Sequence, residues 1–212
     1  MSEIVKVENV TKYFKQEKVL DDVNMNLETG HIYGIVGKNG AGKTVLFKII
    51  AGFIKPSSGK VTVAGKIIGV DRDFPDSLGL IIETPGFLSQ YNAYQNLLYL
   101  ANINNKISKE DIKEAIRMVG LDPDSNKKVG KFSLGMRQRL GIAQAIMENP
   151  NLIILDEPMN GLDKKGIEDV KELLLKLKGD GKTILMASHY AEDMEICDEV
   201  FQMEDGKLGD MK

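Results

Sequence analysis

The sequence contains a single cysteine, Cys197, so no internal disulfide can form, and this suits a reducing compartment. No apolar run approaches the about 18 residues of a membrane-spanning helix. The first six residues, Met1–Lys6, lack the pattern of a signal peptide. We therefore expect a chain that is cytosolic or held at a membrane through a partner.

Neither sign of charge dominates the sequence. The chain has 28 lysine and arginine residues against 31 aspartate and glutamate residues, a formal net charge of -3. This balance argues against binding through bulk positive charge, so we expect no nucleic-acid partner. The length of 212 residues and the hydrophobic content of 42% fit one sizeable α/β domain with a small subdomain.

A glycine-rich segment, Gly37-Lys38-Asn39-Gly40-Ala41-Gly42-Lys43-Thr44, fits the pattern G-x-x-x-x-G-K-[ST]. An apolar run over 32–36 precedes it, and apolar residues at helical spacing follow it, which predicts strand, loop and helix. In this context backbone N–H groups and the helix N-terminus can hold phosphate oxygens. Lys43 is expected to reach the β- and γ-phosphates, and Thr44 to offer its hydroxyl to Mg²⁺. A chance glycine turn is the alternative, which the fixed positions of the motif disfavour.

Strands and helices are expected to alternate along the rest of the chain. Two strands around a turn are predicted over 3–27, with Lys12-Tyr13-Phe14-Lys15 between them. Further strands are expected near 61–63, 78–82, 152–156, 182–187 and 200–203, the last of them closing the fold. Helices are expected over 108–120, 133–148 and 163–178. This order predicts a sheet that is antiparallel near the N-terminus and parallel in its core.

The segment from Thr84 to Asn105 contains no charged side chain, although 28% of its 22 residues would be about six charges. It holds several aromatic residues with Asn and Gln between them, and it is too polar to span a membrane. Two interpretations stay open. The segment is either the core of a small helical subdomain or an uncharged aromatic surface that docks another protein.

Polar side chains follow two of the predicted strands. Asp156 and Glu157 end an apolar run, at the edge where an open α/β sheet places its ligand. Asp156 can hold Mg²⁺ there through water, and Glu157 can polarise an attacking water. His189 follows a later strand and can hydrogen-bond a γ-phosphate, although a lone histidine is usually structural. Ser133 is a good N-cap whose helix offers a further, weaker anion site.

In this order the segments resemble the nucleotide-binding subunit of an ABC transporter. The corresponding segments are the aromatic loop, Walker A (Gly37–Thr44), a polar residue at a strand end (Glu83), a helical subdomain, the signature (Ser133–Met136), the Walker B and catalytic acids (Asp156 and Glu157), the D-loop (Asn160–Asp163) and a switch histidine (His189). The resemblance covers nearly the whole chain. Walker A alone fits many NTPases, whereas the combination is specific to this family.

The resemblance implies a P-loop NTPase core with a mixed sheet, an N-terminal antiparallel β part and an inserted α-helical subdomain. The implied boundaries are 1–83 for the first part of the ATP-binding core, 84–148 for the helical signature subdomain and 149–212 for the second part of the core. ATP and Mg²⁺ are the implied cofactors, and ATP would join two copies into a homodimer. An integral-membrane permease would dock near residues 84–105, placing the chain at the cytoplasmic face of the cell membrane.

The resemblance also implies roles for single residues. The implied catalytic residues are Glu157, His189 and Lys43. The implied Mg²⁺ ligands are Thr44, Glu83 and Asp156. The implied ATP contacts are Phe14, Gly37, Asn39, Gly40, Ala41, Gly42, Lys43, Thr44, Val45, Ser133 and Gly135. Ser133 and Gly135 would reach the ATP of the partner copy, and Phe14 best matches the adenine-stacking position, with Tyr13 as the alternative.

Three positions depart from the family pattern. Met136 stands where glutamine is usual, so an amide that contacts ribose is lost. Glu83 stands in place of glutamine, and when ionised it offers only hydrogen-bond acceptors. Asn160 begins the D-loop, where a small hydroxyl residue is more usual. These segments look like those of bacterial exporters for bacitracin and lantibiotic peptides, which implies an ATPase subunit that powers export of peptide antibiotics or resistance to them.

Two other functions are compatible with a P-loop. A soluble ABC-type ATPase not coupled to transport would carry a long coiled-coil insertion or a second cassette, and the sequence has neither. A GTPase would carry Asn-Lys-x-Asp for guanine, which is also missing from the sequence. A small-molecule kinase would not need the signature segment and the histidine.

Overall fold

The computed structural model describes residues 2–83 and 86–210. Its elements are β1 (Glu3–Phe14), β2 (Glu17–Glu28), β3 (Ile32–Val36), α1 (Lys43–Ile50), β4 (Ser58–Val63), β5 (Lys66–Ile67), β6 (Leu78–Ile81), α2 (Ala93–Asn104), α3 (Lys109–Met118), the 3-10 helix η1 (Val129–Lys131), α4 (Leu134–Ile146), β7 (Leu152–Asp156), α5 (Lys164–Gly179), β8 (Thr183–Ser188), the 3-10 helix η2 (Ala191–Ile196), β9 (Glu199–Glu204) and β10 (Lys207–Asp210). Thr84 and Pro85, where the uncharged segment begins, lie outside the described residues.

Two sheets organise the molecule. The central sheet has the strand order β10-β9-β3-β8-β7-β6, in which β9 through β6 are parallel and β10 is antiparallel. The second sheet has the order β2-β1-β4-β5 and is antiparallel. The predicted mixed sheet with an N-terminal antiparallel part is therefore confirmed.

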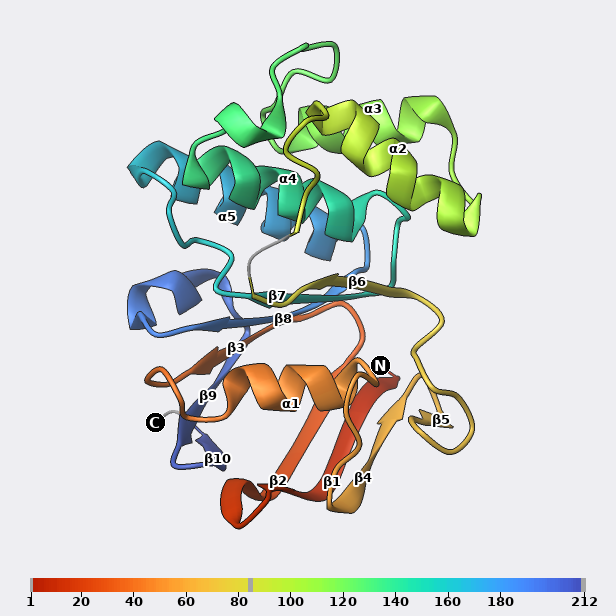
Figure 1. Cartoon of the computed structure of the whole chain (residues 1–212). Coiled ribbons are helices and arrows are strands. Elements are labelled where there is room, and N and C mark those ends of the chain that lie inside the picture. The colour runs from red at the N-terminus through yellow and green to blue at the C-terminus, as the bar shows by residue number, and fades with distance from the viewer. Residues whose placement is uncertain (1, 84–85, 211–212) are drawn as a thin grey trace.

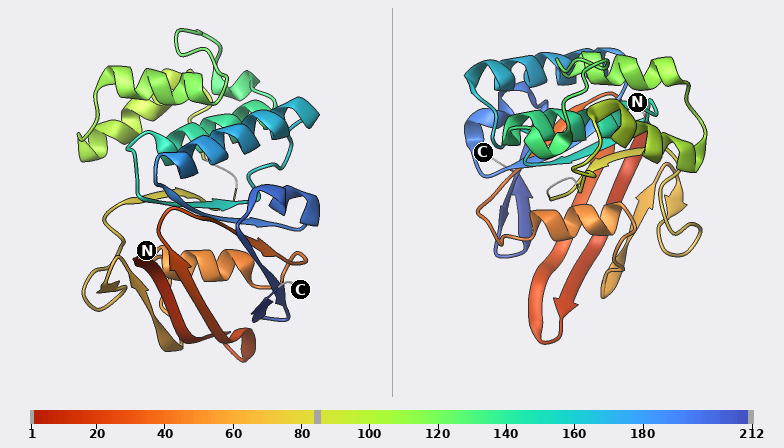
Figure 2. Two further views of the ribbon diagram at one scale, coloured as in Figure 1. Left: turned by 180° about the vertical axis from the view of Figure 1, so that it is seen from behind. Right: turned by 45° about the horizontal axis from the view of Figure 1, so that its top comes forward.

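Helices cover the central sheet on both faces (Figure 1). Helices α2, α3, α4 and α5 form a layer on one face, while α1 lies on the other face, between the central sheet and the antiparallel sheet. The views from behind and from above show the same layers, with α4 and α5 running side by side (Figure 2). None of the helices within the described ranges combines the length and apolar composition needed to cross a bilayer.

Strand β7 shows why the parallel strands are continuous apolar runs. Ile153 and Leu155 pack into the core beneath α2–α5, whereas Leu152 and Ile154 pack into the core that contains α1. Alternate side chains of a strand point to opposite faces, so a strand covered on both faces must be apolar at every position. The continuous run of apolar residues before Asp156 is the sequence signal of this arrangement.

The parallel register brings the polar strand ends to one edge of the sheet. Val36 pairs with Ser188, Asp156 with Ala187, and Ile81 with Leu155. The segments that follow these strands therefore leave the sheet at the same edge, as parallel strands require. This edge carries the P-loop, the two acids, the histidine and Glu83.

The structure differs from the sequence predictions at two hairpins. β1 continues through Tyr13 to Phe14, which pairs with Glu17, so the turn is shorter than predicted and contains Lys15 at φ 56°. The chain also does not end with the strand predicted over 200–203. Asp205 and Gly206 have positive φ angles and turn the chain into β10, so the Asp-Gly pair forms a hairpin turn and does not end the fold.

Candidate active site

Close packing explains the glycines of the P-loop. Gly42 precedes α1 with φ 111°, and a Cβ there would lie 2.8 Å from Leu20 Cδ2. A Cβ on Gly37 would lie 2.4 Å from the Met203 carbonyl oxygen. Side chains at these positions would push the loop away from β2 and β9. A cavity of about 250 Å³ opens beside the loop, lined by Val19, Lys38, Asn39, Gly40, Ala41, Gly42, Lys43, Thr44, Val45, Asp156 and Glu157.

Lys43 is buried at the centre of this cavity's wall. Its Nζ donates to the Gly37 carbonyl at 2.5 Å and to the Lys38 carbonyl at 3.2 Å. The same ammonium lies 3.7 Å from Glu157 Oε1, with only 6% of the side chain exposed. A buried cation is stable only when it is paired and hydrogen-bonded, and these partners satisfy it. The ammonium is therefore fixed in the wall of the P-loop cavity.

A hydrogen bond joins Thr44 to Asp156. Thr44 Oγ1 donates to Asp156 Oδ2 at 2.6 Å, joining the first turn of α1 to the end of β7. Burial raises the pKa of Asp156, and the negative charge of Glu157 adds to it, while the Thr44 hydrogen bond opposes the shift. A buried carboxylate beside a hydroxyl is a pair of hard oxygen donors, which suits Mg²⁺ held with phosphate oxygens. The residues at this position fit the ion.

Glu157 is held in place by several elements. Its backbone has φ 52°, and its N–H donates to the Ala187 carbonyl at 2.9 Å. Gln138 Nε2 on α4 donates to the Glu157 carbonyl at 3.1 Å. His189 Nδ1 lies 2.9 Å from Glu157 Oε2, within hydrogen-bond distance. A carboxylate so oriented, next to a histidine and a lysine, can take a proton from water.

Glu83 stands at the same edge but is turned toward α1. It follows β6 with φ 60°, a left-handed conformation that is uncommon for residues other than glycine. Its Oε1 accepts a hydrogen bond from Lys48 Nζ at 2.6 Å, and 65% of the side chain is exposed. The ligand role predicted for Glu83 stays a prediction.

Three further residues implied by the resemblance lie apart from the P-loop cavity. Phe14 is 45% exposed near the β1–β2 turn, and Lys12 Nζ lies 5.1 Å from its ring centroid. Ser133 caps α4 by accepting from the Met136 N–H at 3.2 Å. Gly135 faces the D-loop, since a Cβ there would lie 2.9 Å from the Gly161 carbonyl oxygen. Tyr13 also lies outside the cavity lining, so the choice between it and Phe14 stays open.

Sequence reasoning missed three residues that touch this site. Val19 lines the cavity from β2, and no sequence signal marks it. Gln138 is buried, although it stands between Arg137 and Arg139 in a segment that is typical of a solvated helix face. Lys48 bonds Glu83, and its place one helical turn after Thr44 was the available signal.

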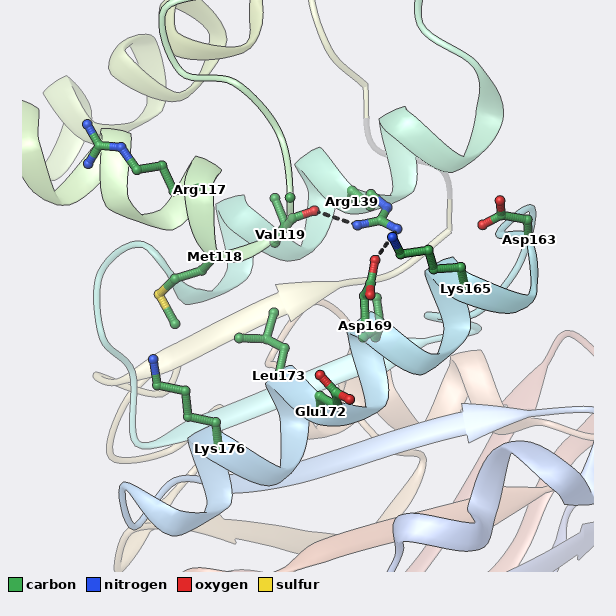
Figure 3. A pocket seen from close by; sticks show the side chains of 12 residues that line it. Arg117, Met118, Val119, Arg139, Asp163, Lys165, Asp169, Glu172, Leu173 and Lys176 are labelled. Carbon is green, nitrogen blue, oxygen red and sulfur yellow. Dashed lines mark hydrogen bonds and ion pairs between the residues drawn. The ribbon is translucent and has the colours of Figure 1, made fainter.

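A second cavity, of about 780 Å³, shares no lining residue with the P-loop cavity and lies between the C-terminal end of α3, α4 and α5 (Figure 3). Arg139 crosses it, donating to the Val119 carbonyl at 2.9 Å and to Asp169 Oδ2 at 2.9 Å. This residue joins the helix that begins at the signature to α3 and to α5.

The model of the ABC transporter family matches residues 20–160, so the chain belongs to this family. It is an ATP-binding subunit with ATPase activity, as the fold and the ordered motifs define it. In the structure of the post-hydrolysis state of the ATP-binding cassette MJ0796, a dimer bound to ADP and Pi, 26% of aligned residues are identical. The TM-score is 0.88 and 99% of both chains is covered.

Several relatives align over almost the whole chain. The uncharacterized ABC transporter ATP-binding protein YybJ of Bacillus subtilis (strain 168) is 45% identical, over 97% of this chain and 94% of its own. The bacitracin transport ATP-binding protein BcrA of Bacillus licheniformis is 42% identical, over 98% and 69%. The lantibiotic transport ATP-binding protein SrtF of Streptococcus pyogenes is 35% identical, over 97% and 89%.

Proposed function

We propose that this ATPase powers a separate membrane permease that exports peptide antibiotics or protects the cell against them. The observation that carries the proposal of hydrolysis at this site is the meeting of Lys43, Glu157 and His189 at one sheet edge. The antibiotic assignment rests on the likeness to the bacitracin and lantibiotic transport proteins.

The roles of the side chains follow from their positions. Lys43 binds the β- and γ-phosphates, while Glu157 accepts the proton of the attacking water. His189 Nδ1, 2.9 Å from Glu157 Oε2, orients that carboxylate, and the histidine would hydrogen-bond the γ-phosphate. Thr44 and Asp156 would hold Mg²⁺, and the ion would offset charge on the phosphates.

The active unit in this proposal is a homodimer. The P-loop cavity of about 250 Å³ is smaller than the ~300–1,000 Å³ typical of ligand pockets. Ser133 and Gly135 lie outside it and are free to complete the site of a second copy. Two copies related by a two-fold axis would each supply both halves.

The permease docks on the uncharged segment, at the cytoplasmic face of the membrane. Along α2, Leu97 and Ala101 are buried in the core, whereas Tyr99 is 57% and Ile103 is 78% exposed. In this proposal both interpretations of the segment hold, each for one face of the helix. Exposed aromatic and aliphatic side chains without charges are typical of the buried centre of a protein interface.

Replacing both Tyr99 and Ile103 with serine is expected to weaken binding to the permease. The double variant should lose most of the permease from a detergent co-purification, because a few residues, with tyrosine enriched among them, carry most of the binding energy of an interface. ATP affinity should stay within about twofold of wild type, since α2 lies outside the P-loop cavity. Leu175→Ser, at a residue 45% exposed on α5, is the matched control. Unchanged permease recovery would contradict docking on α2.

The transport assignment is tested by expressing this chain together with a candidate permease, the membrane protein that co-purifies with it. Co-expression in a sensitive strain is expected to raise the bacitracin or lantibiotic concentration that stops growth, and Glu157→Gln should remove the protection. A pull-down from cell membranes identifies the partner of the chain. Recovery of ribosomes or DNA instead of a polytopic membrane protein would favour the ABC-type ATPase not coupled to transport. Unchanged sensitivity with an active ATPase would remove the antibiotic assignment alone.

Glu83→Gln is expected to keep or raise the ATPase rate. The change removes a negative charge beside the nucleotide and keeps a carbonyl oxygen, while the exposed pair with Lys48 contributes little stability by itself. Steady-state kcat is the measurement, with Asp124→Asn as the control because it removes a similarly exposed carboxylate bonded to a lysine. A tenfold fall in kcat, about 1.4 kcal/mol in the barrier, would give the carboxylate a role of its own.

A further inference from the structure

Lys48 connects the nucleotide helix to the strand end that precedes the uncharged segment. It lies on α1 one turn after Thr44, so the two side chains share a helix face. Its Nζ contacts Glu83 Oε1 at 2.6 Å, and 32% of the lysine side chain is exposed. Neither the family motifs nor the proposed function assigns a role to this lysine.

The Lys48–Glu83 pair lies where negative charge accumulates. Asp156 ends β7 and Glu157 follows it, while Glu83 follows β6, the strand paired with β7. Burial is the main cause that raises the pKa of Asp156, and the charges of Glu157 and Glu83 add to it. A bound triphosphate would bring further negative charge to this edge. The negative charge of the third carboxylate, Glu83, must therefore be neutralised by a cation or kept away from the phosphates.

The backbone at Glu83 fits a carboxylate that is held aside. Its φ of 60° places the residue in the left-handed region, which directs the side chain differently from a continuing strand. The side chain ends on Lys48 of α1, the helix that carries Thr44 in its first turn. The lysine therefore neutralises the carboxylate at the position where the family usually has a neutral amide.

We propose that Lys48 is a positioning residue of the ATPase site, which holds the Glu83 carboxylate against α1 and offsets its charge when nucleotide binds. This inference rests on the proposed binding of nucleotide with Mg²⁺ at Lys43, Thr44 and Asp156. The Lys48–Glu83 pair then has no net charge, like the glutamine side chain that is usual in the family at the position of Glu83. Lys48 does not touch the phosphates, and its effect on them passes through Glu83.

Four proteins test the proposal: wild type, Lys48→Met, Glu83→Gln and the double variant. Methionine keeps the length of the side chain and the helix propensity while it removes the charge. The dissociation constant of a fluorescent ATP analogue with Mg²⁺ is the first measurement. Lys48→Met is expected to weaken binding about three- to tenfold, because an unpaired carboxylate then faces the phosphates. Glu83→Gln and the double variant should both stay within about twofold of wild type.

The effect of Lys48→Met in the Glu83→Gln background separates an action through Glu83 from a direct action of Lys48 on the phosphates. If Lys48→Met weakens binding equally with the native Glu83 and in the Glu83→Gln background, Lys48 acts directly on the phosphates and the inference is overturned. If it changes binding in neither background, the pair is an ordinary surface ion pair and the inference is again overturned. A second measurement, the melting temperature without nucleotide, should be nearly equal for all four proteins.

The chain offers a closely matched control pair on the helical layer. Lys113 Nζ lies 2.6 Å from Asp124 Oδ1, with side-chain exposures of 30% and 68%, close to the 32% and 65% of Lys48 and Glu83. Lys113→Met is expected to leave analogue binding unchanged. Failure of the wild type to bind the analogue would overturn the proposed Mg²⁺–nucleotide site itself. Normal wild-type binding with an unaffected Lys48→Met variant would overturn only this inference.

Discussion

Glu157→Gln is expected to abolish ATP hydrolysis and to leave ATP binding intact. Glutamine keeps the shape of the side chain but cannot accept a proton from water, and loss of a general base lowers kcat by about 10²- to 10⁴-fold. The contact of the side chain with His189, 2.9 Å in the wild type, can be kept by the amide oxygen. Phosphate release at saturating ATP is the measurement, with the dissociation constant of ATP measured in parallel.

The same variant is expected to remain dimeric in ATP. If ATP joins two copies and hydrolysis separates them, a protein that binds but cannot hydrolyse ATP should elute as a dimer in size-exclusion chromatography with ATP. It should elute as a monomer without nucleotide. Glu168→Gln, an exposed carboxylate on α5, is the control and should behave like wild type. Hydrolysis at the wild-type rate by Glu157→Gln would show that another group is the base.

Lys43→Met is expected to remove most nucleotide binding. The ammonium is buried between two loop carbonyls and Glu157. Hydrogen bonds to charged groups contribute about 1.5–3 kcal/mol, so the dissociation constant of ATP should rise by roughly ten- to a hundredfold. Isothermal titration calorimetry with ATP and Mg²⁺ measures it.

A second lysine near a carbonyl serves as the control for Lys43. Lys182 Nζ donates to the Asn149 carbonyl at 3.0 Å, just before β8 and therefore at the opposite end of the parallel strands. Lys182→Met should leave the dissociation constant unchanged. If Lys43→Met bound ATP as tightly as wild type, the nucleotide would have to lie elsewhere than at the P-loop. Calorimetric melting of both variants shows whether either change unfolds the chain.

Much of the candidate site could be predicted because its signals are local. The P-loop motif is a pattern of neighbouring residues, and Ser133, predicted as an N-cap, does cap α4. The parallel edge was also predictable, since an apolar run that ends in Asp156 and Glu157 indicates a strand covered on both faces. The predictions for the turn after Phe14 and for the hairpin to β10 were wrong in detail. At both places residues of the strand or turn were taken to lie beyond the end of a strand.

The sequence by itself determined the class of protein, because the ordered motifs and the continuous apolar strands are patterns of neighbouring residues. Only the tertiary structure decided which distant side chains meet. Lys48 reaches Glu83 across 35 positions and Gln138 reaches the Glu157 carbonyl across 19, contacts that depend on how α1 and α4 pack on the sheet. Such contacts follow from strand order and helix docking rather than from local spacing. The sequence shows only that Glu83 departs from the family pattern, whereas the fold shows that Glu83 is paired with Lys48.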